Sequence, residues 1–103
     1  MTAPMLTVGP AVVDEMVRQA AIEVPGVLRI GRGGPPWRRL GRPGIVSRRR
    51  EGTVAVRLWV VARPGQPLAP LARDIRIAVA AMVERLLGLE LAAVTVVVDG
   101  VGS

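Results

Sequence analysis

The sequence predicts an α/β (α+β) domain, a two-layer sandwich in which two helices cover one face of a small mixed sheet of three or four strands. Two segments with apolar residues at helical spacing predict the helices, and runs rich in Val and Ile predict the strands. Each helix ends at Pro or Gly before a strand, and each amphipathic helix needs a face to cover. The expected order is helix, strand, strand, strand, helix, strand.

The length of 103 residues indicates one domain, residues 1–103, with a core at about 6–101. Half of the residues are hydrophobic but only Trp37 and Trp59 are aromatic, so the core must be aliphatic. The chain has no cysteine, which excludes disulfides and thiolate metal sites. It has no apolar run of about 18 residues and no basic-then-apolar start. We therefore expect no membrane span and no signal peptide, and a soluble or peripheral protein.

The first helix is predicted from Pro10 to about Glu23, since Pro is favoured at the first helical position. A short extended segment is expected before it, at Leu6–Val8. Asp14 and Glu15 are expected in its first turn, where acids complement the helix dipole. The apolar residues share one face: Val13, Met16, Val17, Ala20, Ala21 and Val24.

The first helix ends in the segment Glu23-Val24-Pro25-Gly26-Val27. Pro25 lacks a backbone N–H and pushes Val24 out of the helical region. Gly26 is expected to supply the backbone freedom for a sharp exit. A short strand at Val27–Ile30 should follow.

Residues 31–44 contain five glycines and three prolines, so we expect a flexible, irregular loop there. A β-hairpin should follow, with arms at Ile45–Arg49 and Thr53–Ala62 joined by Arg50-Glu51-Gly52. Alternation along the second arm places four apolar residues beneath both helices: Val54, Val56, Leu58 and Val60.

The opposite face of the sheet should carry Ala55, Arg57, Trp59 and Val61, together with Val97 from the last strand. An uncovered face with this much apolar surface indicates self-association or partner docking. Long arginine side chains lying over it are the alternative. Trp59 and Val61 are therefore candidate interface residues.

The second helix is predicted to begin at Pro67 and to end near Gly88, before a strand at Val94–Asp99. Its apolar stripe comprises Leu68, Leu71, Ala72, Ile75, Val79, Met82, Val83 and Leu86. Ile77, Ala80 and Ala81 lie outside this stripe and form a second candidate interface. Deeper packing of the helix between its neighbours is the alternative.

Positive charge is concentrated between Val27 and Arg63, where ten arginines accompany a single acid, Glu51. Three interpretations remain open: a solvated loop, contact with an anionic membrane or envelope partner, or nucleic-acid binding with Trp37 stacked on a base. The candidate contact residues are Arg29, Arg32, Trp37, Arg38, Arg39, Arg42, Arg48, Arg49 and Arg50.

The side chains available for catalysis are few, because the chain has no His, Cys, Lys or Tyr. Ser47 has no histidine to activate it, and the carboxylates do not cluster in the sequence. We therefore expect no enzymatic activity, no metal and no cofactor. Two G-x-x-G tetrads, at 31–34 and 41–44, lie between strands, whereas the nucleic-acid-binding KH loop joins two helices.

These features resemble the alkaline shock protein family, the YloU-like general stress proteins of Gram-positive bacteria that serve the cell-envelope stress response. The resemblance covers about residues 6–101. It rests on Ala-Ala-x-Glu-Val-Pro-Gly-Val from Ala20, on the glycine-rich loop and hairpin, and on Leu-Gly-Leu around Gly88 before a strand closing on Asp99-Gly100-Val101.

The resemblance implies a non-enzymatic, cytoplasmic scaffold or adaptor that acts through protein–protein contacts near the membrane. Some relatives are held at the inner face of the cell membrane by an integral-membrane partner, and some self-associate. This chain departs from the family at Arg63-Pro64-Gly65, where an aromatic residue and Gly are usual, and in its basic segment at 47–50. The alternative function is a nucleic-acid-binding module that uses the arginine-rich segment 29–50.

Overall fold

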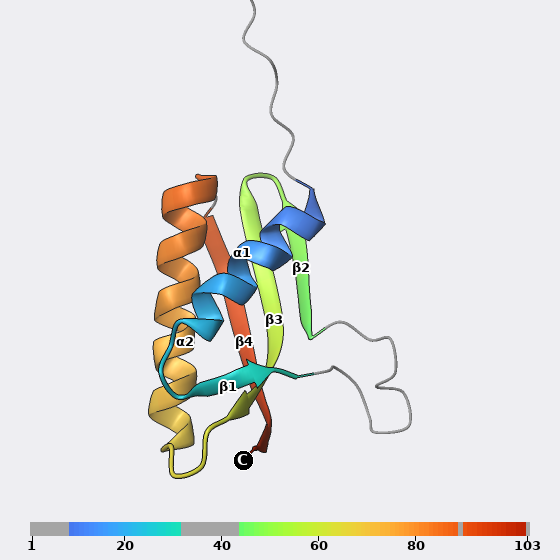
Figure 1. Ribbon diagram of the computed structural model, residues 1–103. Coiled ribbons are helices and arrows are strands. Elements are labelled where there is room, and N and C mark those ends of the chain that lie inside the picture. The colour runs from blue at the N-terminus through green and yellow to red at the C-terminus, as the bar shows by residue number, and fades with distance from the viewer. Residues whose placement is uncertain (1–8, 32–43, 89, 103) are drawn as a thin grey trace, which may run out of the picture.

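The computed structural model describes residues 9–31, 44–88 and 90–102, and the predicted extended segment at 6–8 and most of the predicted loop lie outside them. The elements are α1 (Pro10–Ile22), β1 (Val27–Ile30), β2 (Ile45–Arg50), β3 (Thr53–Ala62), α2 (Leu68–Met82), a π-helical turn η2 (Val83–Leu87) and β4 (Glu90–Val101) (Figure 1). The predicted α+β class and order of elements are confirmed.

Strand β3 is the centre of a mixed four-stranded sheet. On one side it pairs antiparallel with β2 along its first half and with β1 along its second half. On the other side it pairs with β4, which runs parallel to it after the crossover through α2. Strands β1 and β2 therefore follow one another along the same edge of β3.

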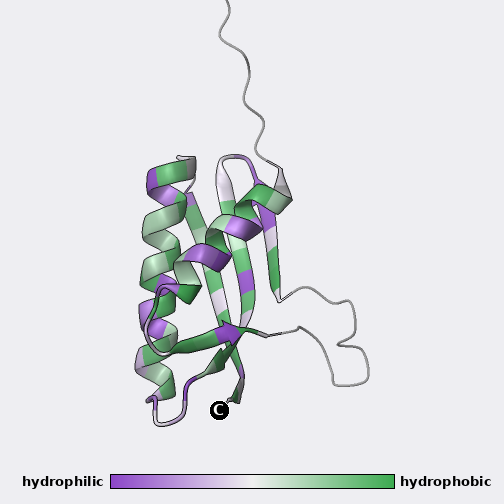
Figure 2. Ribbon diagram, in the orientation of Figure 1, coloured by the Kyte–Doolittle hydropathy of each residue, from purple (hydrophilic) through white to green (hydrophobic). Residues whose placement is uncertain are grey.

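Both helices cover one face of this sheet, as predicted (Figure 1). The side chains of β3 that point toward them are almost completely buried: Val54, Val56, Leu58 and Val60. Apolar residues of α1 and α2 complete an aliphatic core. The hydropathy colouring in Figure 2 shows apolar (green) and hydrophilic (purple) segments interspersed along both helices. The ends of the predicted α2 stripe, Leu68 and Leu86, are exposed.

The first helix ends as predicted but Gly26 serves another purpose. Its φ is not in the left-handed region, which among the described glycines is occupied by Gly52, Gly65 and Gly88. A Cβ on Gly26 would lie 2.7 Å from both the Gln66 side-chain oxygen and Leu71 Cδ1. Gly26 therefore lies where Gln66 and Leu71 pack closely against the α1–β1 connection, and a larger residue there would have to displace these side chains.

The second helix passes into the π-helical turn before Gly88 ends it in a left-handed conformation, φ 64°. This turn was not predicted. Strand β4 is longer than the predicted Val94–Asp99, since it begins at Glu90 and continues to Val101. The pairing with β3 shifts register twice, at Ala92 and at Asp99, so β4 has one extra residue at each of these points.

Candidate functional site: the open face of the sheet

The face of the sheet opposite the helices is left uncovered by the described part of the chain. Residues that pair directly across two strands lie on the same face. Val46 pairs with Arg57, Arg48 with Ala55 and Thr95 with Arg57, so all of these side chains share the open face with Trp59. We call this surface the open face.

A shallow cavity lies on the open face beside Trp59. Two small residues, Ala55 and Ala93, leave room between the larger side chains that surround it. Those side chains are Val46, Arg48, Arg57, Trp59 and Thr95. The cavity is thus lined by one aromatic residue, two alanines and two arginines, among others.

The exposure of the predicted apolar residues on this face is mixed. Trp59 and Val97 are half-buried, and Val46, which the sequence reasoning did not single out, is 38% exposed. The prediction that Val61 is exposed is wrong, because Val61 is only 7% exposed. Gly102, which follows β4, lies close to Val61. Its N–H donates a hydrogen bond to the Ala62 carbonyl, and a Cβ added to Gly102 would lie 3.1 Å from Val61 Cγ1.

The predicted arginine-rich loop leaves and rejoins the sheet beside Trp59. The Gly31 N–H donates to the Trp59 carbonyl at 2.7 Å, and the Trp59 N–H donates to the Gly44 carbonyl at 2.8 Å. Gly31 and Gly44 are in direct contact, since a Cβ on Gly44 would overlap the Gly31 carbonyl oxygen. Both ends of the segment 32–43 are thus fixed at the border of the open face.

Positive charge predominates on the open face. Four exposed arginines belong to it by strand register: Arg29, Arg48, Arg50 and Arg57. Glu90 shares the face at its far end, and the Asp99 carboxylate lies near Gly31. The neighbouring Arg49 points to the helix side by the alternation of β2. The other predicted contact residues lie outside the described residues: Arg32, Trp37, Arg38, Arg39 and Arg42.

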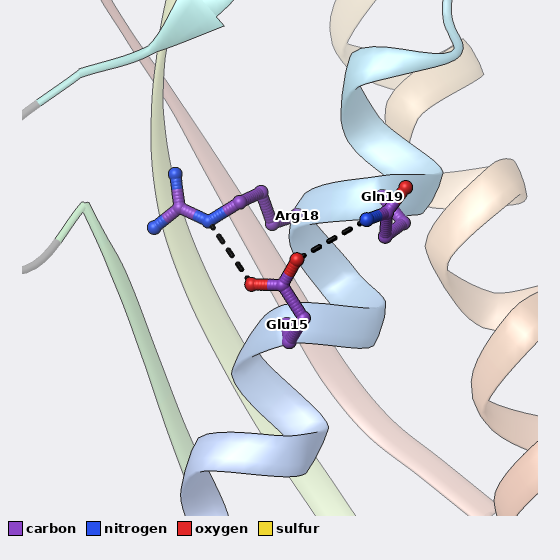
Figure 3. A network of polar contacts seen from close by, with 3 residues as sticks. All are labelled: Glu15, Arg18 and Gln19. Carbon is purple, nitrogen blue, oxygen red and sulfur yellow. Dashed lines mark hydrogen bonds and ion pairs between the residues drawn. The ribbon is translucent and has the colours of Figure 1, made fainter.

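The acidic residues of α1, Asp14 and Glu15, interact with side chains on the helix side of the sheet and not with the arginines of the open face. Glu15 receives a hydrogen bond from Gln19 at 3.1 Å and pairs with Arg18 at 3.6 Å (Figure 3). Asp14 accepts a hydrogen bond from the Ser47 hydroxyl at 2.7 Å. The prediction that Asp14 and Glu15 occupy the first turn is wrong, because the helix begins at Pro10 and that turn has no acid.

The structure divides the candidate patch on α2 between two surfaces. Ile77 is 61% exposed and, with Ala80, lines a shallow groove beside β4. Ala81 instead lines a larger groove between α1 and α2, together with Met16 and Met82. The predicted patch is therefore not a single contact surface.

Within the described residues, no three carboxylate side chains gather into a group that could hold a metal ion. None of the described helices has the length and apolar character needed to cross a membrane.

Two helices on one face of a four-stranded mixed sheet define a small α+β domain, whose opposite face carries Trp59 among arginines. The chain belongs to the alkaline shock protein 23 family, described as having a cell envelope-related function, whose model matches residues 3–103. The resemblance drawn from the sequence is thereby confirmed. No curated protein matches the chain significantly.

Solved structures of the MamM CTD have a similar fold. A manganese form of one variant has a TM-score of 0.64 at 15% identity, covering 87% of this chain and 96% of that chain. A zinc form of another variant gives 0.66 at 14% identity, covering 90% and 87%. A copper form gives 0.65 at 14% identity, covering 87% and 84%. At this identity the similarity describes the fold alone.

Proposed function

We propose that this protein is a non-enzymatic adaptor or scaffold of the cell envelope that works through protein–protein contacts at the inner face of the membrane. The family assignment supplies the envelope-related role. The observation that supports a contact function is the open face, where a half-buried Trp59 and an exposed Val46 lie among four arginines.

A protein partner suits this surface because its centre is apolar and its border is charged. Aromatic residues and Arg are the side chains most enriched at the energetically important centres of protein interfaces. Self-association belongs to the same proposal, with the exposed Ile77 on the helical layer as its candidate contact. Two open faces do not suit one another, because their arginines would be brought together.

The test is the distribution of the protein in fractionated cells of the native host. We expect the wild type in the membrane fraction and the triple variant Arg48→Gln, Arg57→Gln, Trp59→Ser in the soluble fraction. The control is Val12→Ser with Arg18→Gln, since both residues are exposed on α1, away from the open face. Circular dichroism establishes that each variant is folded.

Equal membrane association of the wild type and the triple variant would exclude the open face as the contact surface. Suppose instead that nuclease treatment releases the wild type and that its association with the pelleted fraction weakens steeply as the salt concentration rises. That result would favour the nucleic-acid-binding alternative based on segment 29–50.

A further inference from the structure

The residues that line the cavity beside Trp59 restrict what it can accept. Ala55 and Ala93 contribute methyl groups to the lining, and Trp59 contributes an aromatic ring. An apolar side chain fits such a lining, because burying it there removes methyl and aromatic surface from water. Thr95 adds one hydroxyl group at the border.

Two arginines that line the cavity, Arg48 and Arg57, favour negatively charged groups next to that apolar side chain. Arg48 pairs with Ala55 and Arg57 pairs with Val46, so Arg48 and Arg57 are diagonal neighbours on adjacent strands. Diagonal neighbours in an antiparallel pair are about 7–8 Å apart. Both residues are exposed, so an occupant meets two cationic side chains that start from backbone positions of this spacing.

An extended peptide can match this separation. Its residues i and i+2 point to the same side and lie about 6.6–6.8 Å apart, at about 3.3–3.4 Å per residue. Carboxylates at i and i+2 could therefore pair with Arg48 and Arg57 together, and Arg can bind a carboxylate through two parallel hydrogen bonds. Carboxylates at i and i+1 would point to opposite sides and could not.

We propose that the open face binds an extended acidic segment of a partner protein, with two carboxylates at i and i+2 on Arg48 and Arg57 and a nearby apolar side chain in the cavity beside Trp59. This inference rests on the proposed function and names the chemistry of its partner. Charge complementarity supports it, since Arg29 and Arg50 extend the positive charge on either side.

A membrane surface fits the site less well, because the Trp59 side chain is half-buried. Insertion into a bilayer needs apolar side chains that project from the surface. A single-stranded nucleic acid could stack on Trp59, but it would not require the i, i+2 spacing of carboxylates. The test below therefore includes a membrane surface and a single-stranded nucleic acid as competing ligands.

The test uses the fluorescence of Trp59 in the full chain with Trp37→Phe, which leaves one tryptophan. The first probe is the capped peptide Ser-Glu-Ser-Glu-Ser-Leu-Ser. The matched probe, Ser-Glu-Glu-Ser-Ser-Leu-Ser, has the same composition and charge with adjacent carboxylates. A uridine oligonucleotide and phosphatidylglycerol vesicles are titrated in parallel at the same ionic strength.

We expect the alternating peptide to bind at least about threefold more tightly than the matched peptide, as an added exposed ion pair of up to about 1 kcal/mol allows. Arg48→Gln and Arg57→Gln should each remove this preference. Ala93→Leu should abolish binding by filling the cavity, whereas Ala92→Leu should not, since Ala92 is also exposed but does not line this cavity.

Equal affinity for the two peptides, binding by neither, or tighter binding of the oligonucleotide or the vesicles would each overturn the inference. In those cases, loss of membrane association by the triple variant in cells would still support the proposed adaptor function. The acidic-segment proposal can therefore be wrong while the adaptor proposal is right.

Discussion

Gly31 and Gly44 meet on the backbone of one residue, Trp59, which accepts a hydrogen bond from the first and donates one to the second. The two glycines are also in contact with each other. Strands β1 and β2 thus follow one another as one interrupted strand along β3. The residues that flank the arginine-rich segment, Gly31 and Gly44, lie beside Trp59 at the border of the open face.

This junction should be intolerant of a side chain at position 44. A Cβ there would overlap the Gly31 carbonyl oxygen and lie 2.6 Å from Ile30 Cγ2. We expect Gly44→Ala to lower the free energy of unfolding by about 1–3 kcal/mol, as overpacking does in general. Urea denaturation measures this, with Gly100→Ala as the control because nothing lies within 4 Å of its Cβ position. Equal stability of the two variants would contradict the close contact.

The hydrogen bond from Ser47 to Asp14 should couple α1 to β2. It is 2.7 Å long, partly buried and joins residues 33 positions apart. Ser47→Ala should therefore cost about 0.5–1.5 kcal/mol of unfolding free energy. A double-mutant cycle with Asp14→Ala checks the cause, since the two losses should be less than additive. Strict additivity would mean that the two side chains do not interact in solution.

Two isoleucines on α2, two positions apart, should respond oppositely to the same substitution. Ile75 is 0% exposed, so Ile75→Asp places an unpaired carboxylate in the core and should prevent folding. Ile77 is 61% exposed, so Ile77→Asp should leave the fold intact and abolish any oligomer. Circular dichroism and light scattering measure the two effects. A folded oligomer of the Ile77 variant would exclude this residue from self-association, and failure to fold would place it in the core.

The turn between β2 and β3 offers a way to stabilise the protein. Glu51 has a φ of 45° and Gly52 a φ of 81°, so both central residues are left-handed. Asp tolerates this conformation better than Glu, and Asp-Gly is a favoured sequence for such a turn. Glu51→Asp should raise the free energy of unfolding by a few tenths to about 1 kcal/mol at unchanged charge. Thermal unfolding measures it, and Glu51→Ala should show no gain.

Much of the fold followed from local patterns in the sequence. The alternation in β3 correctly placed Val54, Val56, Leu58 and Val60 beneath the helices, because side-chain direction alternates along a strand. The stops at Pro25 and Gly88 were likewise local. Trp59 was correctly placed on the face opposite the helices for the same reason.

The remaining features depend on contacts between distant segments. Val61 is buried and lies close to Gly102, which no local pattern indicates. Gly26 lies close to the Leu71 side chain and has no left-handed backbone conformation. The cavity beside Trp59 requires the register of β2 and β4 on β3, so Val46 and Ala93 could not be linked to the site from the sequence.

The most direct test of the open face as a contact surface is site-specific photo-crosslinking in living cells of the native host. A photoreactive phenylalanine analogue replaces Trp59 in one strain and Val12, on the outer side of α1, in another. We predict a discrete protein adduct in the membrane fraction from position 59 and none from position 12. An adduct from position 12 alone, or adducts to nucleic acid from position 59, would contradict the account.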